Sequence, residues 1–252
     1  MSSVKYNIEL RPFWTKFFKF DWKFGITMIC LICIPRFILV LHANANGSYG
    51  LIGAIMIISA ISPYIFLNKT GRTSIGIVRT QKYRTLFIAF LFGIAASLLL
   101  YYLGNFLYGV SYENWYFYIA KSYKIPAGIK GSEKMIMFLI MAFVGMTFSP
   151  VGEELFFRGI VQASFEKSMG EKRALIIDCL SFALTHIAHF GIVFINNRFD
   201  LYTVPALIWV SFMFLTSILF YVFKIRSGSL LGAIICHSGF NLGMIFSIFY
   251  LL

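Results

Sequence analysis

Stretches of about 20 apolar residues, separated by shorter polar segments, recur along the chain after residue 23. They are approximately 24–41, 49–67, 85–107, 135–150, 174–195, 203–223 and 229–252. A run of this length can cross a bilayer as a helix, because a helix satisfies its own backbone polar groups without water. The fourth run is short and ends on Ser149, Pro150 and Gly152, which leaves open whether its helix stops there or continues. The pattern predicts an all-α fold, a polytopic membrane helix bundle of about seven transmembrane helices.

The first 23 residues alternate aromatic and basic side chains, a composition suited to a helix that lies in the lipid headgroup region. We therefore predict an N-terminal interfacial helix, with residues 1–23 as a cytoplasmic juxtamembrane amphipathic segment and residues 24–252 as a single transmembrane domain. Ala43-Asn44-Ala45 has the small-x-small form of a signal-peptide cleavage site. The preceding run is long and contains Arg36, which favours a retained span over a cleaved leader.

Composition supports the membrane assignment. Hydrophobic residues make up 59% of the 252 residues and charged residues only 13%, whereas soluble domains have about 25% charged residues. The net charge of +12 comes without the polybasic low-complexity runs of nucleic-acid tails, so we expect no nucleic-acid partner. All four cysteines lie in apolar stretches, which does not favour a secreted disulfide scaffold.

The distribution of Lys and Arg predicts the orientation. If the N-terminus is cytoplasmic, the cytoplasmic segments carry 16 basic residues and the opposite side carries five, with Arg36 inside the first span. Because cytoplasmic loops carry the excess of positive charge, this count predicts a cytoplasmic N-terminus and an external C-terminus.

Polar residues inside the spans mark the candidate chemistry, because each ionisable group at the bilayer centre costs about 2.5 to 3.5 kcal/mol on insertion scales. Glu153 and Glu154 follow the fourth run directly, and Arg158 comes four residues after Glu154. On a helix, Glu154 and Arg158 share a face and can form an ion pair. Glu153 is rotated about 100° away, which leaves one carboxylate free to handle a proton. An interfacial charge cluster that ends a span is the structural alternative.

Two further spans carry histidines. With a helix that starts near residue 174, His186 lies about 18 Å along the axis, close to mid-bilayer. A lone histidine there is more often a helix–helix hydrogen-bonding contact than a catalyst. In the last span, His237 and Asn241 lie one turn apart on one face, where both can donate hydrogen bonds to the same point, as an oxyanion site requires. Small residues on the same helix allow neighbouring helices to approach closely.

These residues form three ordered motifs, Glu-Glu-x-x-x-Arg at 153–158, Phe-x-x-x-His at 182–186 and His-x-x-x-Asn at 237–241. In this order they resemble the motifs of the CPBP family of intramembrane glutamic endopeptidases, which includes type II CAAX prenyl proteases and bacterial bacteriocin-processing and self-immunity proteins. The resemblance covers about the last 100 residues, and it implies a catalytic core in about 135–252.

The resemblance also implies a role for each motif residue. Glu153 and His186 would activate a water molecule for attack on a peptide carbonyl, and His237 and Asn241 would stabilise the resulting oxyanion. Glu154 and Arg158 would orient and tune the site from behind it. Water must reach this site, and the topology predicts an opening toward the cytoplasm.

Two polar residues lie outside the motifs. We interpret His189 as structural or cavity-lining. Asp178 is either interfacial or paired with a basic group such as Arg173, and we assign it no catalytic role.

Three other functions compete with this interpretation. The first is a zinc protease, because Glu and His residues could bind zinc, but the chain lacks His-Glu-x-x-His. The Cys30–Cys33 pair lies in a span far from the histidines in sequence, and we interpret it as packing. We therefore predict no metal and no other cofactor. A non-proteolytic bacteriocin self-immunity or scaffold protein is the main alternative, although a binder has no need for both a base and an oxyanion site. A small transporter is disfavoured because no internal repeat is visible.

We therefore predict an intramembrane glutamate-dependent endopeptidase that cleaves a membrane-associated peptide or protein substrate in contact with the lipid bilayer. The short chain with compact loops favours a bacterial plasma membrane. The sequence carries no signal for an oligomeric state.

Overall fold

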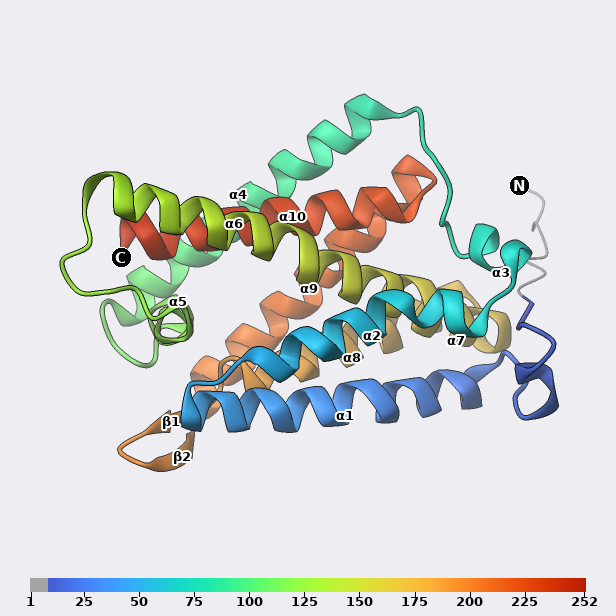
Figure 1. Ribbon diagram of the computed structural model, residues 1–252, viewed down its shortest axis with the longest axis horizontal. Coiled ribbons are helices and arrows are strands. Elements are labelled where there is room, and N and C mark those ends of the chain that lie inside the picture. Colours follow the sequence, from blue (N-terminus) through green and yellow to red (C-terminus); the bar gives the residue numbers. More distant parts are fainter. Residues whose placement is uncertain (1–8) are drawn as a thin grey trace.

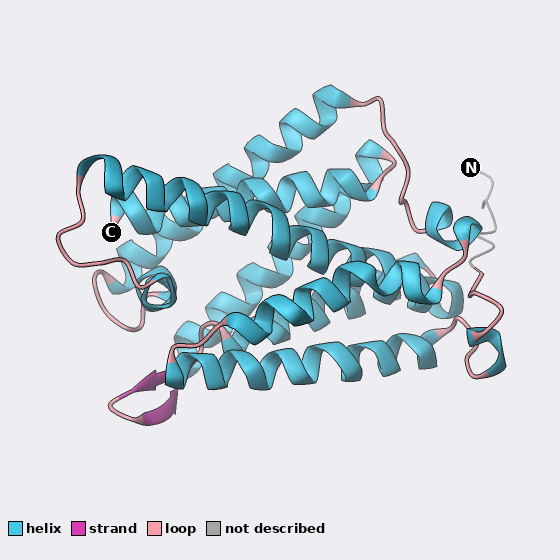
Figure 2. Ribbon diagram, in the orientation of Figure 1, coloured by secondary structure: helices cyan, strands magenta, loops and turns pink. Residues whose placement is uncertain are grey.

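The computed structural model describes residues 9–252, and most of these residues are in helices (Figure 1, Figure 2). Within these residues, five helices are long and apolar enough to cross a membrane, and α2 is a shorter apolar helix. The all-α polytopic membrane bundle is therefore confirmed. Its helices are α1 (Trp22–Asn46), α2 (Gly50–Phe66), α3 (Lys69–Ser74), α4 (Tyr83–Tyr108), α5 (Trp115–Ala120), α6 (Gly131–Glu154), α7 (Gln162–Met169), α8 (Glu171–Thr185), α9 (Thr203–Ser227) and α10 (Leu230–Phe246). The shorter elements are the 3-10 turns η1 (Trp14–Lys16), η2 (Lys121–Tyr123) and η4 (His186–Ala188), the π-helices η3 (Leu155–Val161) and η5 (Ser247–Leu251), and the strands β1 (Ile192–Ile195) and β2 (Arg198–Leu201).

The fourth apolar run does not stop at its proline. The helix continues through Pro150 and the π-helix η3 into α7, so that Gly131–Met169 forms one continuous helical segment. Proline lacks the N–H that would bond to the carbonyl four residues earlier. That carbonyl, of Met146, instead accepts a hydrogen bond from Ser238 Oγ on α10 at 2.6 Å. The neighbouring helix thus satisfies the polar group that the proline leaves free.

The fifth run differs from its predicted extent. Helix α8 ends at Thr185 after 15 residues, about 22 Å, so His186 follows the helix in η4 and is not in the middle of a longer span. Residues 192–201 form an antiparallel hairpin in which Ile195 pairs with Arg198. Its two turn residues, Asn196 and Asn197, both have positive φ, which asparagine tolerates well and which a type I′ turn requires. The asparagine turn and the β-branched residues before it therefore favour a hairpin in a region where hydrophobicity alone predicted the end of the fifth helix.

The N-terminal segment also differs from the predicted interfacial helix, in the part that the structure describes. Residues 9–21 contain a single 3-10 turn, η1, and residues 1–8 lie outside the described part of the chain. The segment binds to the end of α2: Arg11 N donates to Phe66 O at 2.8 Å, and the indole of Trp14 donates to Ile65 O at 2.8 Å. Asp21 then caps α1 by accepting from the backbone N–H groups of residues 23 and 24. Tertiary hydrogen bonds to α2 take the place of a separate helix.

Helix α10 packs against α4, α6 and α9 and carries one of the site motifs into the centre of the bundle (Figure 1). Close backbone contact with α4 depends on two glycines. A Cβ at Gly93 would overlap the carbonyl oxygen of Cys236, and a Cβ at Gly239 would overlap the carbonyl oxygen of Phe90. This confirms that small residues on the last helix allow close approach, because dispersion contacts between backbones then replace the missing hydrophobic driving force.

The two ends of the bundle differ in charge. The segments before α1 and after α2 lie at one end, with α3 and α7, whereas α5, the hairpin and the C-terminus lie at the other (Figure 1). The first end carries most of the basic loop residues and the second end carries few. The fold therefore separates the two sets of loops as the charge count expects, while the side that faces the cytoplasm stays a prediction.

Candidate active site

Glu153 lies in the last turn of α6, and only 1% of it is exposed. Its Oε1 accepts hydrogen bonds from Arg36 Nη2, at 2.9 Å, and from Ser149 Oγ one turn earlier on the same helix. Its Oε2 has no hydrogen-bond partner among the described residues and lies 3.8 Å from His186 Nε2. One oxygen thus fixes the carboxylate in place and the other remains available.

The orientation of His186 follows from its backbone contacts. Its Nδ1 lies 2.7 Å from the carbonyl oxygen of Phe182, and a carbonyl can only accept, so Nδ1 carries the hydrogen. In the neutral ring, Nε2 then presents a lone pair toward Glu153. The indole of Trp209 donates to the carbonyl of His186 at 3.1 Å, which holds the turn η4 against α9. The Phe-x-x-x-His spacing therefore serves to set the tautomer of the histidine.

A second buried charge cluster lies behind Glu153. Arg158 Nε is 3.1 Å from Glu154 Oε2, which confirms the predicted pairing across one helical turn. Asp178 Oδ2 lies 3.6 Å from the same nitrogen, and Asp178 is fully buried. Asp178 therefore pairs with a basic group, as one of the two predicted alternatives requires, but the partner is Arg158 and not Arg173, because α8 packs this carboxylate toward η3. The interfacial alternative is wrong, since the residue is fully buried. Arg158 also donates to Ser217 Oγ on α9 at 2.7 Å. The cluster thus joins four elements, α6, η3, α8 and α9.

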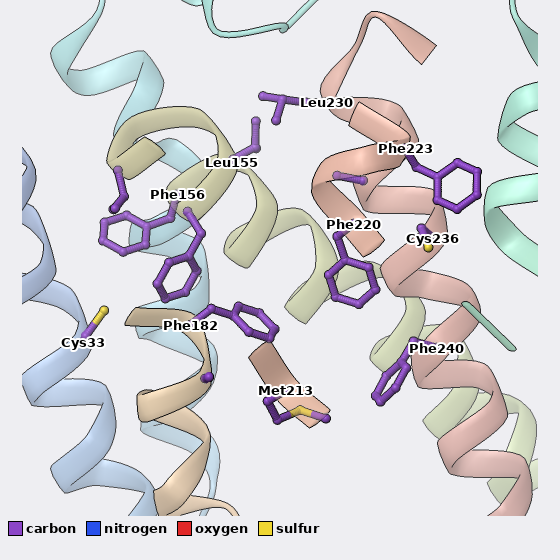
Figure 3. Close-up of a cluster of buried hydrophobic side chains, with 14 of the residues drawn as sticks. Cys33, Leu155, Phe156, Phe182, Met213, Phe220, Phe223, Leu230, Cys236 and Phe240 are labelled. Atoms are coloured by element: carbon purple, nitrogen blue, oxygen red, sulfur yellow. The ribbon is translucent and has the colours of Figure 1, made fainter. Parts of the chain in front are cut away.

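Aromatic rings surround the guanidinium. Figure 3 shows Phe182 and Phe220 within the cluster of buried side chains, and the Arg158 guanidinium carbon lies 4.5 Å and 5.4 Å from the centres of these two rings. A cation over an aromatic face is stabilised by the negative charge of the ring face, and more strongly when it is desolvated. The ring of His237 stacks on Phe220, with centroids 4.5 Å apart. The same aromatic core thus supports both the arginine and the histidine of α10.

The last motif joins the two clusters. His237 Nδ1 lies 2.8 Å from Glu154 Oε1 and donates to it, which leaves Nε2 as the nitrogen that is not bonded to Glu154. Asn241 Nδ2 donates to Gly145 O on α6 at 2.8 Å, which leaves its second amide hydrogen free of that bond. Both residues are anchored to α6 through one atom, and each keeps a second polar atom for a ligand.

The four predicted catalytic residues line one cavity of about 220 Å³, together with Arg36 and Ser149. His189 also lines it, which confirms its interpretation as a cavity residue. Tyr49 and Tyr123 line the far part, near the α1–α2 connection and η2. The cavity therefore extends toward the end of the bundle that carries α5, and not toward the basic end where we predicted the opening (Figure 1). Gly131–Met169 continues as helix past Glu153 toward the basic end.

Sequence reasoning missed two residues that hold Glu153. Arg36 was visible as an ionisable group within the first span, the strongest available signal, but nothing local in sequence identified its partner 117 residues away. Ser149 lies four residues before Glu153, a spacing that places both side chains on one helix face. Among the described residues, no three His, Cys, Asp or Glu side chains are placed to hold a metal ion together.

The fold and the site define a multi-pass membrane protein with a buried carboxylate–histidine centre. Residues 135–243 match the family model described as type II CAAX prenyl endopeptidase, Rce1-like. This segment is therefore similar to the CAAX-type intramembrane protease family, in agreement with the CPBP family that the motifs resemble. All six predicted site residues lie within the matched segment, whereas Arg36 lies outside it. Neither a curated protein nor a solved structure matches the chain.

Proposed function

We propose that the protein is an intramembrane endopeptidase that hydrolyses a membrane-associated peptide or protein substrate with a water molecule activated by Glu153 and His186. One observation carries the proposal: Glu153 Oε2 and His186 Nε2 are both acceptors in the neutral-histidine state, and they face each other 3.8 Å apart beside the cavity. Two acceptors at this separation cannot bond to each other, but one water molecule can donate a hydrogen to each. The water oxygen then keeps a lone pair for attack.

In the proposed reaction, the water oxygen forms a bond to the peptide carbonyl carbon while one of its protons passes to Glu153. The carbonyl oxygen becomes an oxyanion, which the free amide hydrogen of Asn241 stabilises, together with His237 Nε2 when that ring carries both protons. The C–N bond then breaks, and the amine leaves with the proton that Glu153 received. Glu154 and Arg158 position His237 through its Nδ1 hydrogen bond.

We also propose that residues 24–252 form one transmembrane domain with its catalytic core in 135–252, in a bacterial plasma membrane with the N-terminus in the cytoplasm. The orientation is testable at two exposed arginines, Arg79 and Arg198. In cells whose outer face is accessible, a membrane-impermeant maleimide should label Arg198→Cys and leave Arg79→Cys unlabelled, in a Cys30→Ser background. Labelling of Arg79→Cys alone would reverse the orientation.

The test of catalysis uses purified protein and a library of membrane-peptide substrates. Wild type should cleave at least one peptide, Glu153→Gln should cleave none, and Glu133→Gln, an exposed acid at the start of the same helix, should match wild type. A chelator should leave wild-type activity unchanged, since the proposed base and oxyanion site consist of side chains alone. Chelator sensitivity would assign the reaction to a metal enzyme. If no peptide is cleaved and Glu153→Gln retains the cellular phenotype, the immunity or scaffold function replaces the protease.

A further inference from the structure

A second cavity, of about 140 Å³, adjoins the one that contains Glu153 and His186. The two cavities share four lining residues, Tyr49, Ile119, Ser122 and His189. His189 lies against both, and its Nε2 is 3.5 Å from Arg36 Nη2. The two cavities are therefore separated by no more than these shared side chains, and a peptide bound in the first lies next to the second.

The second cavity is positively charged. Lys121 and Lys124 line it, and no Asp or Glu is among its lining residues. In the part of the chain that the structure describes, neither lysine has a carboxylate within 4.0 Å. Partial burial lowers the pKa of Lys121 from its ordinary value, because desolvation penalises the ammonium form. An anion in this cavity would relieve that penalty.

Both ammonium groups have defined positions. Lys121 Nζ lies 4.5 Å from the ring centre of Tyr112 and 5.3 Å from that of Tyr118. Lys124 has a left-handed backbone conformation, with φ of 47°, which turns the chain sharply after η2. A Cβ at Gly47 would lie 3.0 Å from Lys124 Nζ, so the glycine leaves room for the ammonium beside the α1–α2 connection. The two charges thus come from one turn but are held by different parts of the fold.

We infer that the second cavity is a subsite for a carboxylate of the peptide substrate, held by Lys121 and Lys124 while the neighbouring apolar residues of the peptide occupy the catalytic cavity. This inference rests on the proposed function. A carboxylate suits the two ammonium groups because each lysine provides a strongly hydrated point charge with three rotatable donors. It also explains why this end of the site carries cations and no acids.

A peptide carboxylate has two sources, the C-terminus and an acidic side chain. Four peptides with one shared apolar sequence and scissile bond separate them: C-terminal acid or amide, each with Asp or Asn at one position. Because an extended chain advances about 3.3 to 3.6 Å per residue, moving the Asp one residue at a time from the scissile bond measures the span between the two sites. Cleavage is measured in vesicles of zwitterionic phosphatidylcholine.

Wild type should show a KM about fivefold to tenfold lower for peptides with a well-placed carboxylate than for the doubly neutral peptide, the size expected for partly exposed ion pairs. Lys121→Met with Lys124→Met should abolish this preference, so that all four peptides have the same KM. Lys130→Met, in the same loop but outside the cavity, should retain the preference. Salt should weaken the preference in wild type and in Lys130→Met, and should have no such effect in the double lysine variant.

Equal KM values for all four peptides in wild type would overturn the subsite while the proposed protease function stands. Failure of wild type to cleave any of them, with no difference from Glu153→Gln, would instead overturn the proposed function. A third arm adds anionic lipid to the vesicles. If wild type responds to that lipid, the lysine substitutions remove this response, and neither protein responds to the charge of the peptide, the cavity binds a lipid headgroup and the substrate subsite is wrong.

Discussion

Arg36 on α1 and Glu153 on α6 form a buried ion pair, with Nη2 of the arginine 2.9 Å from Oε1 of the glutamate. Arg36 is 4% exposed and Glu153 1% exposed, so water screens the pair very little. The arginine thereby fixes one carboxylate oxygen and leaves the other facing His186. The first span, which lies outside the family-matched segment, thus contributes directly to the candidate site.

Replacement of Arg36 with Gln should both destabilise the protein and reduce its activity. Removing one partner of a buried ion pair leaves the other charge uncompensated, which costs about 3–5 kcal/mol. Thermal unfolding in detergent and peptide cleavage measure the two effects. Arg36→Lys should recover part of the stability because it retains the charge, and less of the activity because it loses the planar fork.

Arg198→Gln provides the control for this change. Arg198 pairs with Asp200 at 3.0 Å on the exposed hairpin, and such surface pairs contribute about 0–1 kcal/mol. Its substitution should shift neither unfolding nor cleavage measurably. An Arg36→Gln protein with wild-type stability and activity would show that Arg36 has no positioning role.

Substitutions of Glu154, Arg158 and Asp178 should reduce the stability of the protein by different amounts. Arg158→Met leaves two buried carboxylates without a cation and should strongly reduce folded protein. Asp178→Asn should cost much less, because Arg158 keeps the closer Glu154, at 3.1 Å against 3.6 Å for Asp178. Folded yield and unfolding temperature give the order of the effects.

A double-mutant cycle identifies the partner of Asp178. Asp178→Asn and Arg158→Lys should show an interaction energy, since additivity fails for groups in one network. Asp178→Asn and Arg173→Gln should be additive, because Arg173 is exposed. Coupling with Arg173 in place of Arg158 would contradict the arrangement in the structure.

The sequence predicted the bundle because apolar runs of bilayer length have few other folded solutions. It also predicted the pair of Glu154 and Arg158, since four residues of helix define that contact locally. It overextended the fifth span, because hydrophobicity does not distinguish the end of α8 from strand β1. Asn196 and Asn197, between β-branched runs, carried a hairpin signal that the length of the apolar run obscured.

The partners of Arg36 and Asp178 could not be predicted in the same way. Each ion pair joins different helices, and its geometry depends on how α1 and α8 pack against α6 and η3. One sequence shows that a buried charge needs a partner, but not which of several charges lies nearest. The direction in which the cavity extends could not be predicted for the same reason, because it depends on how α2, α5 and η2 are placed around the site.

Because α4 and α10 pack closely, replacing a glycine with alanine should affect stability very differently at Gly93 and at Gly53. Gly93→Ala should destabilise the protein by about 1–3 kcal/mol, because its Cβ would overlap the Cys236 carbonyl oxygen and lie 2.7 Å from Phe240 N. Since α10 carries His237 and Asn241, the same change should lower kcat. Gly53→Ala in α2, whose Cβ meets nothing within 4 Å, should be neutral or slightly stabilising. Equal thermal unfolding of the two variants would contradict the close contact.

The tautomer of His186 provides the most direct check on the proposed chemistry. Because Nδ1 lies 2.7 Å from the Phe182 carbonyl, the neutral ring should carry its hydrogen on Nδ1, although free imidazole side chains favour Nε2. Long-range ¹⁵N–¹H correlations on protein labelled at histidine distinguish the two tautomers, and the loss of signals in His186→Gln, with His237→Gln as the second reference, assigns the resonances. A hydrogen on Nε2 would place a donor toward Glu153 Oε2, so the two groups would bond to each other and could not both accept from one water molecule. In that case, Glu153 alone would have to activate the water, and His186→Gln, which can still donate, should retain activity.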